Sequence, residues 1–235
     1  MRICCDANSL PFRSDSVPFV FCYQTLHHFP DLTPIVKEIH RILSPGGHFF
    51  FDEEPYKKVF HVNLYKGKSI YSKESLRASK TKKVFDFFFA EKSCNEVDHG
   101  IIENEEIAIA VWRQALNSFQ EKNVKLQSIK NISSELFNPK HYMAFLLAYL
   151  FGGNISGTCR KAGSSIKSEI SILDAIICPL CIENGRESKI DQENPWFSCS
   201  ECGNKFPIID GVVFLFSHKK FEELYPDIFI KVIRK

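Results

Sequence analysis

The residues with the clearest chemical signature are four cysteines near the end of the chain. Cys178 and Cys181 form one Cys-x-x-Cys pair, and Cys199 and Cys202 form a second pair. Each pair can turn two thiolates toward one point, and the residues between the pairs can form a hairpin that brings them together. Four thiolates at about 2.3 Å from a Zn²⁺ ion complete a tetrahedron and leave no position for water. The spacing therefore predicts a structural zinc site rather than a catalytic one.

Two other interpretations of these cysteines are four free buried thiols or a redox pair. A redox motif needs one Cys-x-x-Cys beside the start of a helix, whereas here two pairs mirror each other. A module of about 40 residues buries little apolar surface, so bound Zn²⁺ is expected to supply much of its folding free energy. We place this module at residues 172–217.

The segment after the second cysteine pair sharpens the prediction. Residues 206–215 read Phe-Pro-Ile-Ile-Asp-Gly-Val-Val-Phe-Leu, in which Asp-Gly is a turn signal between two strand-like runs. With the two cysteine pairs, this segment resembles a zinc-ribbon family whose members activate RNA and protein methyltransferases and also occur fused to them. The resemblance implies one possible role, a non-catalytic interaction or activator module for a methyltransferase.

A second signature consists of three segments near the N-terminus. Residues 6–12 read Asp-Ala-Asn-Ser-Leu-Pro-Phe, residues 19–29 end in Leu-His-His-Phe, and residues 38–47 end in Leu-Ser-Pro-Gly-Gly. Together they resemble the middle of a class I S-adenosylmethionine-dependent methyltransferase of the kind that methylates small molecules. The resemblance implies an α/β fold with an incomplete Rossmann-like sheet, whose complete strand order in the family is 3-2-1-4-5-7-6. Methyl transfer to an unidentified acceptor is the activity it implies.

The same resemblance assigns roles to individual residues. Asp6 would accept the exocyclic amine of the cofactor's adenine, and the backbone of Ala7 would lie against that ring. Tyr23 and Gln24 would end the family's fourth strand beside the cofactor, where open α/β sheets bind ligands. His27 and His28, just beyond, could line the acceptor pocket or act as a base. Packed histidines at the start of a helix are the simpler interpretation, and we favour it.

The elements that must position these residues follow from the hydrophobic pattern. A strand at residues 19–23, a helix opening at Thr33-Pro34 and closed at residues 45–47, and a strand at residues 49–51 form one βαβ unit. Further along, we expect a helix capped by Asn104, a strand at 124–129 and a helix at 142–150. Pro18 departs from the family pattern, which usually has an acidic residue at the mouth of the strand. We divide the chain into a partial methyltransferase domain (1–151), a linker (152–171), the zinc ribbon and a tail (218–235).

Two parts of the family's cofactor site have no counterpart in the sequence. They are the glycine-rich loop on the first strand and the acidic residue after the second. Met1 falls inside the expected third strand, so we expect either a fragment or a short protein whose sheet is completed by a partner chain. Cofactor binding and methyl transfer would be impaired, and residues 19–23 would form an exposed apolar edge. A Gly-x-Gly-x-Gly segment encoded upstream of Met1 would restore the enzyme interpretation.

Composition limits the partners and the cell compartment that we expect. The net charge is +2 and no basic block lies beside aromatic residues, which counts against a nucleic-acid partner. The longest apolar run, residues 143–151, is about half the roughly 20 residues that a membrane helix needs. The N-terminus does not read as a signal peptide, and an odd number of cysteines, 9, is typical of a reducing compartment. We therefore expect a cytoplasmic protein without a membrane segment.

Overall fold

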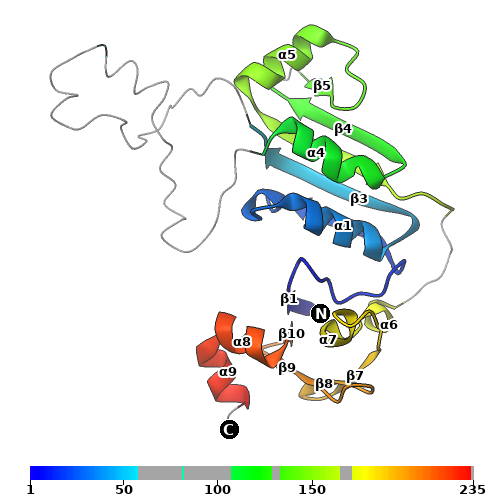
Figure 1. Ribbon diagram of the computed structural model, residues 1–235, viewed down its shortest axis with the longest axis vertical. Helices are drawn as coiled ribbons and strands as arrows, with labels where there is room; N and C mark the ends of the chain where they lie inside the picture. The colour runs from blue at the N-terminus through cyan, green and yellow to red at the C-terminus, as the bar shows by residue number, and fades with distance from the viewer. Residues whose placement is uncertain (58–80, 82–106, 129–132, 165–170, 234–235) are drawn as a thin grey trace. The chain divides into compact units, whose positions relative to one another are not determined.

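The computed structural model describes residues 1–57, 81, 107–128, 133–164 and 171–233, which include two five-stranded sheets (Figure 1). The chain divides into two compact units. One comprises Met1–Val20, Pro34–Phe49 and Lys161–Lys235, and the other comprises Phe21–Thr33 and Phe50–Arg160.

The first sheet, here called the central sheet, has the strand order β2-β3-β6-β4-β5. Its strands are β2 (Val17–Tyr23), β3 (Leu43–Pro55), β4 (Glu121–Gln127), β5 (Ser133–Glu135) and β6 (Asn154–Arg160). The helices of this part of the chain are η1 (Leu26–His28), α1 (Leu32–Ile42), α4 (Ile109–Ala115), η3 (Leu116–Ser118) and α5 (Tyr142–Phe151).

The direction of the strands confirms the expected α/β architecture. Near the start of β2 and β3, the Pro18 carbonyl lies against Gly47, and beyond the end of β2 the Gln24 N–H donates to the Asp52 carbonyl of β3. The two strands therefore run parallel, joined by the crossover helix α1 as predicted. β6 runs antiparallel to β4. The order β2-β3-β6-β4 corresponds to the 4-5-7-6 part of the sheet that the sequence resemblance implied.

Helix α1 forms because one of its faces is apolar and both of its ends are capped. Ile35, Val36 and Ile39 recur at helical spacing and are almost completely buried. At its start, Asp31 Oδ1 accepts the Thr33 N–H at 2.8 Å, so the cap is Asp31 rather than the expected Thr33. At its end, the Lys161 ammonium donates to the carbonyls of His40 and Arg41 in the last turn and to that of Leu43 just beyond it.

The linker prediction is wrong for residues 154–160, which form β6. A Cβ atom at Gly157 would lie 2.8 Å from Val124 Cγ2 and 3.1 Å from the Phe51 ring. The glycine that indicated a linker therefore allows three strands to approach closely in the core of the second unit. Phe51 also stacks on the fully buried Trp112 of α4, with ring centroids 5.4 Å apart.

The second sheet, here called the ribbon sheet, has the strand order β1-β10-β9-β8-β7. Its strands are β1 (Arg2–Cys5), β7 (Ile190–Glu193), β8 (Trp196–Cys199), β9 (Lys205–Ile209) and β10 (Val212–Leu215). The accompanying helices are α6 (Ile172–Ala175), α7 (Pro179–Ile182), α8 (His218–Leu224) and α9 (Pro226–Ile233). The last two occupy the segment expected as a tail, where Phe221 and Phe229 pack on Phe214 and Phe216.

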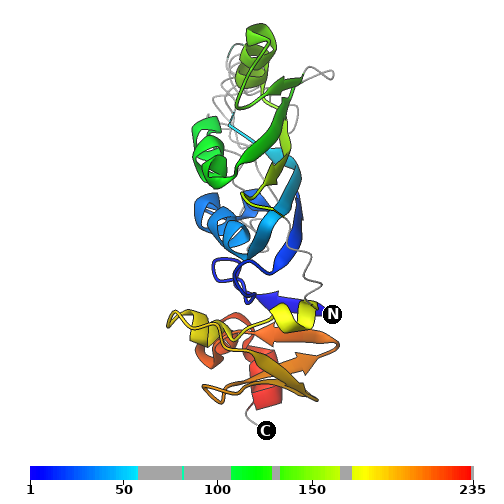
Figure 2. The same cartoon turned by 90° about the vertical axis from the view of Figure 1, so that its right-hand side faces the viewer.

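The position of β1 corrects the expectation that the chain begins inside the third strand of the methyltransferase sheet, the sheet that contains residues 19–23. Arg2 to Cys5 pair in parallel with Val212 to Leu215, so β1 is a strand of the ribbon sheet (Figure 2). Two further hydrogen bonds join the N-terminal segment to the segment before the first cysteine pair. The Arg13 N–H donates to the Ala175 carbonyl, and the Ile177 N–H donates to the Pro11 carbonyl. A β-strand needs a hydrogen-bonding neighbour, and β10 provides it for β1.

The predicted exposed edge at residues 19–23 is confirmed for the part of the chain that the structure describes. β2 is the first strand of the central sheet, with Phe19 51%, Phe21 56% and Tyr23 48% exposed. Pro18 lies in this strand. Proline is tolerated there because β2 is an edge strand of the described sheet.

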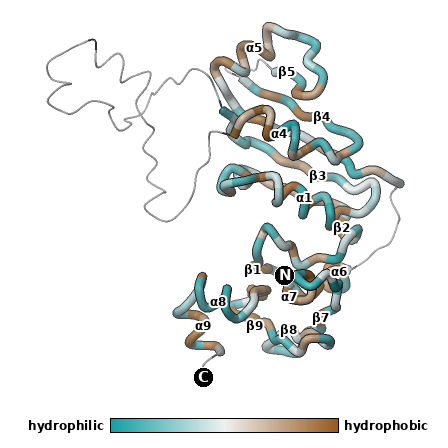
Figure 3. The backbone as a smooth tube through the Cα atoms, viewed as in Figure 1, coloured by the Kyte–Doolittle hydropathy of each residue, from teal (hydrophilic) through white to brown (hydrophobic). Residues whose placement is uncertain are grey.

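The remaining predicted elements were found where the structure describes the chain. β4 begins three residues and ends two residues before the strand expected at 124–129, and α5 ends one residue after the expected bound. The helix expected after Asn104 is α4, although Asn104 itself is outside the described residues. α5 is apolar along its length (Figure 3). Within the described ranges, no helix combines the length and the apolar character needed to span a membrane.

Candidate functional site

The four predicted cysteines come together in the ribbon. Cys178 is the N-cap of the short helix α7, and Cys181 lies within that helix. Cys199 ends β8, and Cys202 lies in the turn before β9. The Sγ atoms of Cys178 and Cys202 are 3.6 Å apart, those of Cys181 and Cys199 are 3.8 Å apart, and all four lie within 4.8 Å of one another. Four sulfurs at about 2.3 Å from a central ion would be about 3.8 Å apart. The cluster therefore fits a tetrahedral Zn²⁺ ion.

The electrostatics of the cluster also suit a divalent cation. Burial raises the pKa of the Cys178 and Cys199 thiols. Burial acts in the same direction on Cys202, but the Asn204 side chain and backbone and the neighbouring thiols together lower its pKa to about 6. Asn204 Nδ2 lies 3.1 Å from Cys202 Sγ. A bound cation would favour the thiolate form of all four ligands.

A second set of polar groups lies where β2 and β3 end. Glu54 of β3 is completely buried, and its carboxylate accepts three successive backbone N–H groups. Thr25 and Leu26 donate to Oε1 at 2.7 and 3.0 Å, and His27 donates to Oε2 at 3.1 Å. Glu54 thereby satisfies the N–H groups at the start of η1, which no other described group caps. This carboxylate fixes the loop that follows β2.

His27 makes a second contact with the same carboxylate. Its ring atom Nδ1 lies 2.9 Å from Glu54 Oε2, and the residue is 9% exposed. The ring of His28 lies beside it, with the ring centroids 4.2 Å apart. The structure therefore places both candidate histidines at the carboxyl end of β2. The partner of His27 there is the Glu54 carboxylate.

Tyr23 and Gln24 are held by the residue before Glu54. The Tyr23 hydroxyl donates to Glu53 Oε2 at 2.7 Å, and Gln24 Nε2 donates to the same oxygen at 3.0 Å. The hydrogen bond to Glu53 raises the pKa of Tyr23. Gln24 and Glu53 both have positive φ, 45° and 53°, so the chain turns sharply at each of these points. The two strand ends are thus tied together by side chains as well as by the sheet.

The predicted adenine-binding residues lie in the other compact unit. Asp6 Oδ1 accepts from the Asn8 backbone and side chain at 2.9 and 3.1 Å, and Oδ2 forms an ion pair with Lys220 of α8. Burial alone would raise the pKa of Asp6, but Lys220 and Asn8 lower it below its ordinary value. Ala7 lies in the same turn. Their role in cofactor binding stays a prediction.

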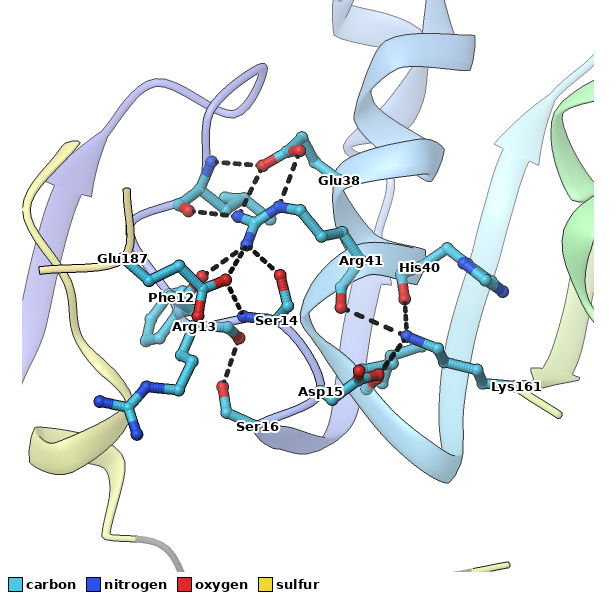
Figure 4. A network of polar contacts seen from close by, with 12 residues as sticks. Phe12, Arg13, Ser14, Asp15, Ser16, Glu38, His40, Arg41, Lys161 and Glu187 are labelled. Atoms are coloured by element: carbon cyan, nitrogen blue, oxygen red, sulfur yellow. Dashed lines mark hydrogen bonds and ion pairs between the residues drawn. The ribbon is translucent and has the colours of Figure 1, made fainter. Parts of the chain in front are cut away.

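The loop that carries this motif is clamped by two residues that the sequence interpretation missed. The Arg41 guanidinium donates to the carbonyls of Leu10 and Phe12, both at 2.8 Å, and to the carboxylate of Glu38 (Figure 4). Glu38 in turn accepts the Leu10 N–H at 3.0 Å. The spacing of Glu38 and Arg41, three residues apart on a helix, is the signal that could have revealed the pair. Glu54 offered no comparable signal, because its partners are backbone groups.

Comparison with known proteins shows which proteins the N-terminal segment is similar to. Residues 2–51 match the family described as a methyltransferase domain. A segment of 77 residues is 34% identical to the uncharacterized methyltransferase YcgJ of Bacillus subtilis, covering 30% of this chain and 30% of that protein. A segment of 47 residues is 40% identical to the protein named "Probable polyketide synthase 13" of Dictyostelium discoideum. It covers 20% of this chain and 2% of that protein.

The chain thus spans less than a third of the length of these curated relatives. Among solved structures, it is similar to a complex between the Trm112 methyltransferase activator of Haloferax volcanii and a methyltransferase. The identity is 18%, the TM-score is 0.34, and the match covers 69% of this chain and 61% of that chain. A methyltransferase from Mesorhizobium loti gives 14% identity and a TM-score of 0.36 over 67% of this chain and 68% of its own.

Proposed function

We propose that the chain is an S-adenosylmethionine-dependent methyltransferase-type protein that acts on an unidentified acceptor and carries a structural zinc ribbon. The observation that carries this proposal is the methyltransferase-family segment, residues 2–51, whose strands β2 and β3 end in a set of fixed polar groups. Ligands of open α/β sheets bind at the carboxyl ends of the strands. Tyr23 and Gln24 would lie beside the cofactor, and catalysis would depend on alignment of the acceptor with the methyl group.

We further propose that these residues bind the cofactor weakly by themselves. The sequence contains no Gly-x-Gly-x-Gly segment, which lets the backbone approach such a cofactor. The Asp6 carboxylate, the expected partner of the adenine amine, is already engaged by Asn8 and Lys220. Binding of adenine there would have to displace an ammonium group, which reduces the net gain.

For the ribbon, the proposed ligands are Cys178, Cys181, Cys199 and Cys202, and the proposed ion is Zn²⁺. Four thiol ligands complete its coordination, so the ion would stabilise the fold rather than take part in methyl transfer. The sulfur distances and the lowered pKa of Cys202 support this assignment.

The second candidate function is that of a zinc-dependent activator or interaction module without catalysis of its own. It is favoured by the pairing of β1, which belongs to the methyltransferase-family segment, with β10 of the ribbon. Such pairing would let the ribbon stabilise a methyltransferase segment directly. A partner chain that pairs with β2 and completes the central sheet is part of the same proposal, supported by the exposure of Phe19, Phe21 and Tyr23.

Thermal unfolding of the zinc-loaded chain distinguishes these functions. At 1 mM S-adenosylmethionine, weak binding with a Kd of about 1 mM would stabilise the chain by about 0.4 kcal/mol and raise Tm by about 1 °C. Adenosine and methionine at the same concentration are the controls. No difference from these controls would favour the activator module, and a rise of several degrees would contradict the proposed impairment.

A further inference from the structure

The contact between Glu54 and His27 has a chemical consequence beyond fixing the loop. Glu54 is 0% exposed, and His27 is the ion-pair partner that the described residues give it. The backbone N–H groups of residues 25–27 already stabilise the carboxylate as an anion. As an anion, a carboxylate only accepts hydrogen bonds.

This partner determines which ring nitrogen of His27 carries the proton. Nδ1 lies 2.9 Å from Glu54 Oε2, so the proton of the neutral ring is on Nδ1. Nε2 is then left with a lone pair. If Nε2 takes up a proton, the resulting imidazolium lies directly against the carboxylate, which stabilises its charge. A carboxylate that orients an imidazole in this manner is the arrangement by which histidine serves as a general base.

We propose that His27 is the general base for the methyl acceptor and that Glu54 is its positioning residue. This inference rests on the proposed methyltransferase function. It narrows the acceptor to a hydroxyl, amine or similar group that loses a proton on methylation. As the acceptor atom bonds to the methyl carbon and the carbon–sulfur bond of the donor breaks, the acceptor proton passes to His27 Nε2. The imidazolium then releases this proton to water, which restores the starting state.

The location of the pair supports this role. His27 lies in η1, directly after Tyr23 and Gln24 at the end of β2, and both partners belong to the same compact unit. His28 provides an internal comparison, because it is the neighbouring histidine and its ring lies beside that of His27. A residue with a solely structural function would need the Nδ1 contact but not a reactive Nε2.

Acylation of histidines by diethyl pyrocarbonate, mapped by peptide mass spectrometry on the zinc-loaded full chain, tests the pair. The reagent reacts with an unprotonated ring nitrogen, so His27 should react in the native protein. In Glu54→Gln, the amide oxygen can still accept from Thr25 and Leu26, while its NH₂ loses the bond from the His27 backbone N–H but can donate to Nδ1 and move the ring proton to Nε2. His27 should then react about tenfold more slowly. The matched control His28→Gln should leave the rate at His27 unchanged.

Two results would overturn the proposal: a native His27 that reacts only after unfolding, or an equal rate in Glu54→Gln. Should that variant fail to fold, ¹⁵N NMR of the wild-type imidazoles decides, since a proton found on Nε2 of neutral His27 contradicts the inference. These readouts need neither cofactor nor acceptor. The proposal for His27 can therefore fail while binding of S-adenosylmethionine is observed, and it can hold while such binding is absent.

Discussion

The ribbon sheet and the central sheet bury their apolar strands in different ways. The ribbon encloses a core of short strands around its cysteine cluster, in which Phe197, Phe206 and Val213 are at most 3% exposed. The central sheet buries β3 but leaves the aromatic side chains of β2 about half exposed. A metal cluster can complete a core within few residues, whereas an α/β sheet depends on further strands or helices to cover each of its surfaces. The two regions should therefore respond differently to the loss of one interaction.

The largest expected effect is the loss of the metal from the ribbon. Cys199→Ser removes one of four ligands, and the binding free energy of a structural Zn²⁺ ion is on the order of 10–16 kcal/mol. We expect the variant to lose bound zinc and the ribbon to unfold. Zinc analysis and circular dichroism check this, with Cys22→Ser in β2 as the cysteine control. Retention of one zinc per chain in Cys199→Ser would contradict the proposed ligand set.

The next effect concerns the central sheet. Glu54→Ala leaves three backbone N–H groups of the loop without their acceptor in a buried site, which should cost about 3–5 kcal/mol of unfolding free energy. The adjacent Glu53→Ala removes an exposed carboxylate and should cost less than about 1 kcal/mol. Urea unfolding of both variants measures the difference. Equal losses would show that burial of Glu54 does not control the stability of this strand end.

A smaller, pH-dependent effect is expected at Asp6. Its pKa is lowered in the folded protein, so its contribution to stability is present above the ordinary carboxyl pKa and is lost as the pH falls through the folded value. Asp6→Asn should therefore cost up to about 1 kcal/mol at pH 7 and less at pH 3. Urea unfolding at the two pH values tests this, and Lys220→Met should show the same pH dependence. A cost that grows on acidification would contradict the sign.

The smallest effect on stability is expected at the exposed strand. Phe21→Lys replaces an apolar side chain that is 56% exposed, so the unfolding free energy should change by less than about 1 kcal/mol. Aggregation on concentration should decrease, because charged residues at an edge strand oppose edge-to-edge pairing. Light scattering of the variant and of Phe21→Tyr measures this. Unchanged aggregation would mean that β2 is not the surface through which chains associate.

The sequence was most informative where local spacing determines structure. Two Cys-x-x-Cys pairs predicted the cysteine cluster, and the apolar pattern predicted the β2-α1-β3 unit, because each depends on residues close in the chain. It failed for residues 154–160, where glycine and serine suggested a linker although Gly157 is required by the neighbouring Val124 and Phe51. It also failed for β1, whose partner strand lies at the other end of the chain.

The candidate site was predicted only in part for the same reason. Tyr23, Gln24 and the histidines follow a recognisable strand, but Glu54 acts through backbone groups about thirty residues earlier in the chain. No pattern of residue types marks a carboxylate that caps a distant loop. The engagement of Asp6 by Lys220 is likewise a contact between the two ends of the sequence.

Hydrogen–deuterium exchange of the zinc-loaded chain, with and without several millimolar S-adenosylmethionine, tests whether the ends of β2 and β3 bind the cofactor. We predict slower exchange in the loop after β2 (residues 23–28) and at the end of β3 (residues 52–56), with the cysteine ribbon between 178 and 202 unchanged. Protection confined to the ribbon, or equal protection by adenosine alone, would contradict the claim that these two strand ends form the methyl-transfer site.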